Sequence, residues 1–144
     1  GKTWKDTPFT HIDRGTAVKL HDGDRLAVLS IGPVGNLVAK AVSQYSDKGI
    51  NILHYDMRFI KPIDTKALEE CCNLAATIIT VEDGTMTGGL HSAVAEYIAV
   101  NNRQCKLISL GGPDRFITQG TPSELYTDCK YNSDDILKVI GDNL

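Results

Sequence analysis

The chain has 144 residues, of which 42% are hydrophobic and 23% charged, a balance that indicates one folded globular domain rather than a disordered or membrane-embedded chain. No apolar run reaches the roughly 20 residues that span a bilayer, so we expect a cytoplasmic protein without a membrane partner. The net charge of −3 supplies no basic field, which excludes nucleic acid as an expected partner. Because the chain opens on Gly1 rather than methionine, we expect a piece of a larger protein, with a linker over residues 1–15 and one domain over 16–144.

Segments of strand character alternate with segments of helical periodicity along the chain. The predicted strands are short apolar runs bounded by turn residues, at 25–31, 50–56, 77–82 and 105–110, with a shorter edge strand at 16–20. The predicted helices carry apolar side chains at three- and four-residue spacing, at 34–45, 64–75 and 90–98. This alternation predicts a mainly parallel sheet with helices on both faces, in which the strand at 105–110 is central.

Three helix starts carry recognisable capping residues. Asp64 is the expected cap of the helix that runs through Ala75. The segment "TPSE" at 121–124 combines a threonine cap, a proline at the first helical position and a glutamate three residues later, which together form a capping box. Ser133 is the expected cap of the last helix, whose first turn holds two aspartates where the helix dipole favours acids.

Polar residues follow the predicted strands at the points where function gathers in parallel sheets, outside the carboxyl ends of the strands. If the strands are parallel, these groups share one rim. The expected rim residues are Asp56, Arg58, Glu82, Asp114 and Arg115. Such an edge is a ligand site, a surface that docks against another domain, or a solvated network of salt bridges, and composition leaves these alternatives open.

The glycine-rich stretch "VEDGTMTGGLHSAV" at 81–94 joins a predicted strand to a predicted helix. Backbone amides around Gly88 and Gly89 lie where a helix start can hold an anion, with His91 beside them. However, Glu82 and Asp83 would repel an anion, and no lysine follows the glycines as in a phosphate-binding loop. We therefore favour a packing turn in which glycine brings the helix close to the sheet and Glu82 is presented at the rim.

Other catalytic patterns are incomplete. The stretch "SIGPVGNL" follows a strand, but Val34 and Leu37 occupy positions where a dinucleotide fingerprint needs glycine. The four histidines lack metal-ligand spacing, the four cysteines lack C-x-x-C spacing and are expected to be buried and reduced, and no nucleophile elbow is present. We therefore assign no catalytic, cofactor-binding or metal-binding residue to this chain.

Three motifs occur in register: "DMRFIKPID" (56–64), "TVEDGTMTGGLHSAVAE" (80–96) and "GGPDRFITQGTPSEL" (111–125). Together they resemble the C-terminal domain of the transketolase superfamily, and the resemblance runs from about Ile12 to the last helix. Their order and spacing are most similar to the 1-deoxy-D-xylulose-5-phosphate synthases, although transketolases and the beta chains of pyruvate dehydrogenase-type complexes share the domain. The resemblance implies a three-layer α/β/α sandwich with a mainly parallel five-stranded sheet and one antiparallel edge strand.

The resemblance also implies an intact homodimeric enzyme that binds thiamine diphosphate and Mg²⁺. Such a synthase joins pyruvate to glyceraldehyde 3-phosphate and releases carbon dioxide, supplying isoprenoid, thiamine and pyridoxal synthesis. In the family, the diphosphate motif and the glutamate that activates the cofactor lie in an N-terminal and a pyrimidine-binding domain, and neither can be placed on this chain. We therefore expect a domain that is catalytically silent alone and that serves architecture and dimer contacts through the rim. The alternative is a stand-alone interaction module that binds a small anion on the same rim.

Overall fold

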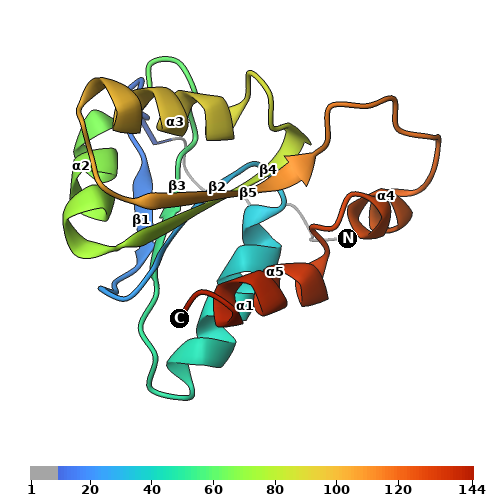
Figure 1. Ribbon diagram of the computed structural model, residues 1–144, viewed down its shortest axis with the longest axis horizontal. Coiled ribbons are helices and arrows are strands. Elements are labelled where there is room, and N and C mark those ends of the chain that lie inside the picture. Colours follow the sequence, from blue (N-terminus) through green and yellow to red (C-terminus); the bar gives the residue numbers. More distant parts are fainter. Residues whose placement is uncertain (1–9) are drawn as a thin grey trace.

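The protein is described by a computed structural model over residues 10–144, in which a five-stranded sheet is flanked by helices (Figure 1). The linker predicted over residues 1–15 therefore lies largely outside the described residues. The strands are β1 (Val18–His21), β2 (Ala27–Ile31), β3 (Leu53–Asp56), β4 (Thr77–Thr85) and β5 (Lys106–Gly112). The helices are α1 (Gly35–Ser46), α2 (Thr65–Leu74), α3 (Leu90–Val100), α4 (Pro122–Asp128) and α5 (Ser133–Gly141).

The sheet has the strand order β1-β3-β2-β4-β5. The last four strands in the chain are parallel to one another, whereas β1 pairs antiparallel with β3 at one edge. This arrangement confirms the expected mainly parallel sheet with one antiparallel edge strand. The prediction that the strand at 105–110 is central was wrong, because β5 pairs only with β4 and forms the other edge. Its apolar run is explained by the helices on both faces, because Ile108 and Leu110 pack in the first core and Leu107 packs against the second.

Helices cover both faces of the sheet and create two separate cores. In β2, Val28 points to the face covered by α1 and α5, whereas its neighbours Ala27 and Leu29 point to the face covered by α2 and α3. The first core also contains Val38, Val42, Ile79, Val81, Ile136 and Ile140, and the second contains Leu53, Leu68, Cys71, Ile78, Leu90 and Val94. The expected three-layer sandwich is thus confirmed.

Local capping follows the sequence at two of the three predicted positions. Asp64 accepts hydrogen bonds from the amides of Lys66 and Ala67 at the start of α2, and its second oxygen accepts one from Ala17 ahead of β1 at 2.8 Å. The capping box at the start of α4 is also present. Ser133 is not the cap of α5, because Asn132 has the extended backbone of a cap and its side chain accepts the first-turn hydrogen bonds.

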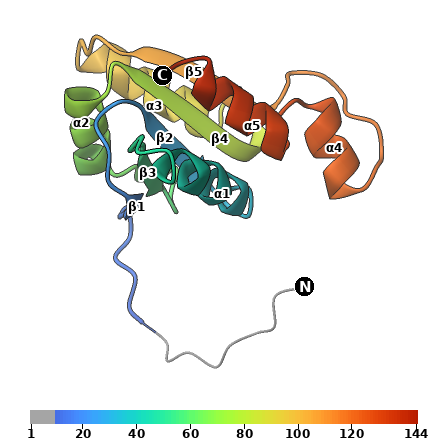
Figure 2. The ribbon, with the colours of Figure 1, turned by 90° about the horizontal axis from the view of Figure 1, so that it is seen from below.

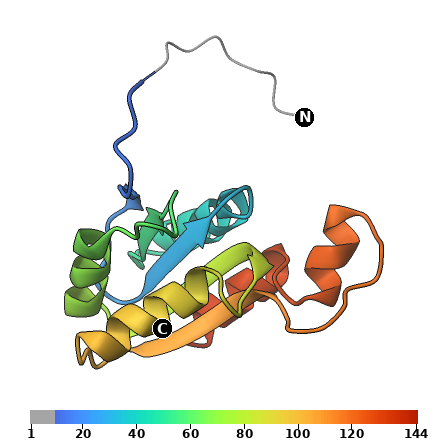
Figure 3. The same cartoon turned by 90° about the horizontal axis from the view of Figure 1, so that it is seen from above.

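The segment between β5 and α5 stands apart from the sandwich. We call residues 113–128 the arm, which consists of a loop and the helix α4. None of the residues of α4 is buried. Figures 2 and 3 show the loop and α4 projecting beyond the edge of the sheet. The arm contacts the first core through the partly buried side chain of Tyr126.

Candidate functional site

The carboxyl ends of the parallel strands share one edge of the sheet, and the chain reverses its winding there between β2 and β4. It leaves β2 towards α1 on one face and leaves β4 towards α3 on the other. Ligands of open α/β sheets bind in the crevice at such a switch point. Here the crevice is a cavity of about 280 Å³ lined by Ile31, Gly32, Pro33, Ile60, Glu82, Asp83 and Gly84.

Glu82 does not present its carboxylate at this rim. Its side chain is buried, with 3% of the residue exposed, and its oxygens accept hydrogen bonds from the amides of Leu90 at 2.7 Å and His91 at 2.9 Å. These amides belong to the first turn of α3, where the helix dipole favours a negative charge. The prediction that Glu82 is a rim contact was wrong, because the unpaired amides of the helix start bind it inside the domain.

The glycine-rich turn before α3 is built around that carboxylate. Gly88 adopts a φ of 85° and donates its amide to Ser92 at 2.8 Å, while the Gly89 amide donates to the carbonyl of Met86. A Cβ on Gly89 would lie 2.0 Å from Oε2 of Glu82, so only glycine allows this approach. The amides at positions 88–91 all have acceptors within the protein, and an added phosphate would meet the charge of Glu82. The geometry therefore supports a packing turn rather than an anion site.

His91 is also tied to β4. Besides its amide bond to Glu82, its ring Nδ1 lies 3.4 Å from the hydroxyl oxygen of Thr80, which is buried. The side chain of His91 is half-buried. Its contacts fasten the helix start to the sheet and give it no free amide for a ligand.

Asp56 and Arg58 form a tight turn at the end of β3. The carboxylate of Asp56 accepts a hydrogen bond from the Arg58 amide at 3.1 Å. Arg58 has a φ of 55°, a left-handed conformation that costs a residue with a side chain about 1–2 kcal/mol. Its side chain is exposed, so the turn presents a guanidinium group to solvent at this end of the rim.

Asp114 and Arg115 lie on the arm, at the other end of the rim. Arg115 forms an ion pair with Asp128 of α4 at 2.5 Å, and this hydrogen bond raises the pKa of its guanidinium. Both side chains are about half exposed, so the pair contributes little to stability. The ends of β3 and β5 are separated by three strand spacings, about 14 Å. The predicted rim residues thus share an edge but form separate groups.

Asp83 is a structural residue that sequence reasoning did not include among the rim residues. Its two oxygens accept hydrogen bonds from the hydroxyls of Tyr126 at 2.8 Å and Tyr131 at 3.2 Å, and the two rings are 4.9 Å apart. The bond to Asp83 and burial raise the pKa of Tyr126, and burial followed by the charge of Asp83 raises the pKa of Tyr131. We call Asp83, Tyr126 and Tyr131 the clasp, which joins α4 and the segment after it to β4. The pair "ED" at a strand end was visible, but its tyrosine partners lie more than 40 residues away.

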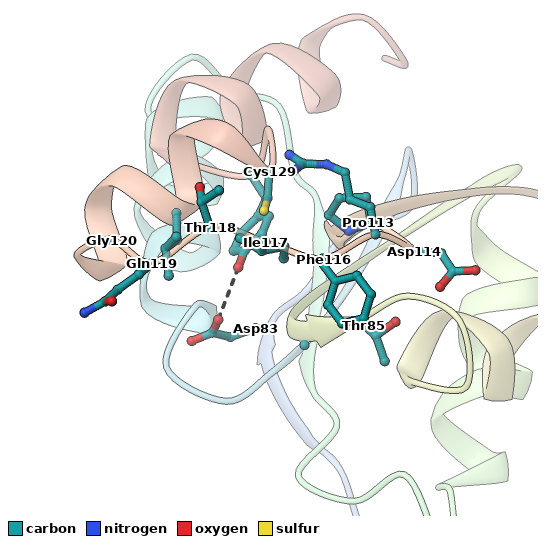
Figure 4. A pocket seen from close by; sticks show the side chains of 15 residues that line it. Asp83, Thr85, Pro113, Asp114, Phe116, Ile117, Thr118, Gln119, Gly120 and Cys129 are labelled. Carbon is teal, nitrogen blue, oxygen red and sulfur yellow. Dashed lines mark hydrogen bonds between the residues drawn. The ribbon is translucent and has the colours of Figure 1, made fainter.

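A larger cavity of about 880 Å³ lies between the clasp and the arm. Figure 4 shows the side chains that surround it, from the end of β4, the loop of the arm and the start of the following segment. The apolar part of the lining consists of Pro113, Phe116, Ile117, Leu125, Cys129 and Tyr131. Phe116 is fully exposed and Ile117 is 41% exposed, so the cavity opens beside an uncovered apolar tip. Sequence analysis did not single out this tip.

The described residues do not fit the cofactor that the family resemblance implies. No group of three or more His, Cys, Asp or Glu side chains within residues 10–144 is arranged to hold a metal ion. The helix start that would suit a diphosphate is filled by Glu82.

Within residues 10–144, no helix is both long and apolar enough to cross a membrane.

Comparison with known proteins gives relatives across nearly the whole chain. The 1-deoxy-D-xylulose-5-phosphate synthase of Porphyromonas gingivalis is 43% identical over 137 residues, which are 94% of this chain and 21% of that protein. The synthase of Parabacteroides distasonis is 44% identical over 139 residues, which are 96% of this chain and 22% of that protein. The chain therefore spans about a fifth of the length of these relatives.

Solved structures share the fold. One described as a split-gene transketolase, an inactive beta4 tetramer, matches with a TM-score of 0.84 and 25% identity, over 94% of this chain and 44% of that chain. The transketolase of Campylobacter jejuni matches with a TM-score of 0.63 and 13% identity, over 95% of this chain and 20% of that chain, and shows the fold alone. The family model for the transketolase C-terminal domain matches residues 15–136. The chain thus belongs to the transketolase C-terminal domain family.

Proposed function

We propose that this chain is the C-terminal domain of a longer 1-deoxy-D-xylulose-5-phosphate synthase and that its own role is architectural. Relatives with that name match 94–96% of this chain but only 21–22% of their own length, which supports a larger protein with further domains. The single observation that carries the architectural role is the position of Glu82, which closes the glycine-rich start of α3 to an anion. A domain closed in this way contributes contacts rather than cofactor chemistry.

In this proposal the intact enzyme is a cytoplasmic homodimer. Thiamine diphosphate and Mg²⁺ are bound by the preceding domains, and the cofactor supplies the carbanion chemistry that joins pyruvate to glyceraldehyde 3-phosphate with loss of carbon dioxide. Residues of this chain take no step in that reaction. The structural neighbour described as an inactive beta4 tetramer supports the proposal that other domains bind the cofactor. That chain carries the same fold and is described as inactive in that form.

The rim supplies the proposed contacts with the preceding domains or the second subunit. Asp56 and Arg58 are expected to make them at the end of β3, and Asp114 and Arg115 on the arm. The turn fixes the backbone of Arg58 at this end of the rim, and its exposed side chain is available there for a contact. Glu82 is excluded from this set because it is buried.

The test compares the 144-residue chain with the full-length protein expressed from the complete reading frame. With pyruvate, glyceraldehyde 3-phosphate, thiamine diphosphate and Mg²⁺, the full-length protein is expected to form deoxyxylulose 5-phosphate and carbon dioxide in equal amounts, and the 144-residue chain neither. Ketol transfer between sugar phosphates without carbon dioxide would assign the protein to the transketolases instead. A frame that starts close to Gly1, together with saturable binding of phosphate compounds, would support a stand-alone module.

The contribution of the rim is tested in the full-length protein with Arg58→Ala. The proposal predicts a weaker dimer or a lower turnover, because a charged contact at a domain boundary is lost. Lys66→Ala is a suitable control, since Lys66 is another exposed cation, near the start of α2. If Arg58→Ala leaves both dimerisation and turnover unchanged, the residues at this end of the rim form only a solvated network.

A further inference from the structure

The arm is joined to β4 through the carboxylate of Asp83 and is braced by two contacts within itself, although none of the residues of its helix is buried. Asp83 binds the hydroxyls of Tyr126 and Tyr131. Arg115 is paired with Asp128 across the arm, and the carboxylate of Glu124 accepts the amide hydrogen bond of Thr121 at 2.8 Å. The contact with β4 gives the arm a defined position in the isolated domain, where its outer surface is uncovered.

The tip of this ordered arm is apolar and uncovered. The ring of Phe116 is fully exposed and Ile117 next to it is 41% exposed, beside the cavity of about 880 Å³. A phenylalanine buries about 150–250 Å² when a partner covers it, so exposing it in a fixed conformation forgoes a large stabilisation. Exposed apolar side chains grouped at a groove mark interaction sites.

We propose that the Phe116–Ile117 tip and the groove beneath it are the docking site for a segment of the preceding domains of the same polypeptide. The expected segment has an apolar side chain that enters the groove and a lysine or arginine beside it. This inference rests on the proposed function only in requiring that such domains exist, which the match to a fifth of the relatives' length supports.

The size of the surface favours a tethered segment over a second molecule. A stable interface between separate chains buries about 800 Å² on each partner. Two apolar side chains and a groove of this size would bury only a few hundred Å². A segment joined to the domain by the chain itself has an effective concentration in the millimolar range, at which a small apolar contact is sufficient.

The charge of the groove identifies the flanking residue. Asp83 and Asp114 line it, and the positive charge of Arg115 is already balanced by Asp128. The surface around the tip is therefore acidic, and a basic side chain next to the apolar anchor complements it.

The experiment measures how accessible the arm is in the 144-residue chain and in the full-length protein. Two readouts are chymotryptic cleavage after Phe116 and hydrogen exchange of peptides covering residues 113–120. Both rates are expected to be at least about tenfold lower in the full-length protein, because docking removes the open state. Equal rates in the two proteins would overturn the proposal.

Matched variants separate docking from folding. In the 144-residue chain, Phe116→Ser is expected to leave the melting temperature unchanged, since the ring contacts solvent. In the full-length protein the same change is expected to return the exchange rate of residues 113–120 to that of the 144-residue chain. Val100→Ser is the control, because Val100 is 72% exposed and is the last residue of α3, and it should leave the arm protected.

Three other outcomes are distinguishable. If the 144-residue chain forms a dimer in sedimentation measurements, and if Phe116→Ser abolishes both the dimer and a concentration-dependent protection of the arm, the occupant is a second copy and the proposal is wrong. If the full-length protein protects the arm but does not form deoxyxylulose 5-phosphate, the docking site stands and the proposed function fails. If it forms the product with an unprotected arm, only the docking site fails.

Discussion

Replacing Glu82 with glutamine tests the account of the glycine-rich turn most sharply. The substitution keeps the size of the side chain and one carbonyl oxygen, but it removes the charge and places an amide donor against one of two backbone donors. The buried carboxylate accepts from Leu90 at 2.7 Å and from His91 at 2.9 Å, so one of these amides loses its acceptor. The perturbation therefore acts on electrostatics and hydrogen bonding with little change in packing.

The expected loss follows from these two contributions. A charge at a partly buried helix N-terminus contributes up to about 2 kcal/mol, and a buried donor left without an acceptor costs about 1–3 kcal/mol. We expect Glu82→Gln to lower the free energy of unfolding by about 2–4 kcal/mol. For a domain of this size each kcal/mol shifts the melting temperature by about 3 °C, so the shift should be about 6–12 °C.

Urea denaturation and thermal melting of the 144-residue chain measure this loss. Glu96→Gln is the matched control, because Glu96 is exposed on the same helix and should change stability by less than about 0.5 kcal/mol. A Glu82→Gln variant within about 0.5 kcal/mol of the parent would refute the reasoning, since an internal cap with two amide partners cannot be neutralised without cost.

Three further predictions concern the turn, the arm and acid stability. Gly89→Ala should destabilise the domain by more than about 2 kcal/mol, because its Cβ would meet a carboxylate oxygen at 2.0 Å; Gly84→Ala, which has open space, should remain within about 1 kcal/mol, both by urea denaturation. Asp83→Ala should raise hydrogen exchange in α4 about tenfold as two hydroxyl bonds are lost, and an unchanged rate would show that the clasp does not hold the arm. Burial and then His21 lower the pKa of His54 from 6.5 to about 4. Between these values the unfolded chain binds the extra proton, so stability should fall as pH falls from 6.5 to 4, by about 3 kcal/mol in total. The urea midpoint should depend less on pH over that range in His54→Gln than in the parent chain. The same pH dependence in both proteins would count against the role of His54.

Features that depend on neighbours in sequence could be predicted. The alternation of strands and helices indicated the three-layer fold, and the caps at Asp64 and Thr121 were visible because both partners of each lie within three residues. The cap of α5 was misplaced by one residue, since Asn132 and Ser133 are both common cap residues and only the backbone conformation distinguishes them.

Features that depend on distant partners could not be predicted. The sequence showed that acids near the glycines would repel an anion, but not that Glu82 itself occupies the anion position, which requires the turn to fold back over eight residues. The partners of Asp83 lie 43 and 48 residues away. The exposure of Phe116 could not be predicted, because it depends on which parts of the fold surround the loop, and these are distant in sequence.

The measurement that tests the central claim most directly is a calorimetric titration of the 144-residue chain and of the full-length protein with thiamine diphosphate in the presence of Mg²⁺. The account predicts saturable binding by the full-length protein and no detectable heat of binding for the 144-residue chain, because Glu82 already fills its helix start. Saturable binding by the 144-residue chain would contradict the claim that cofactor chemistry lies in the other domains.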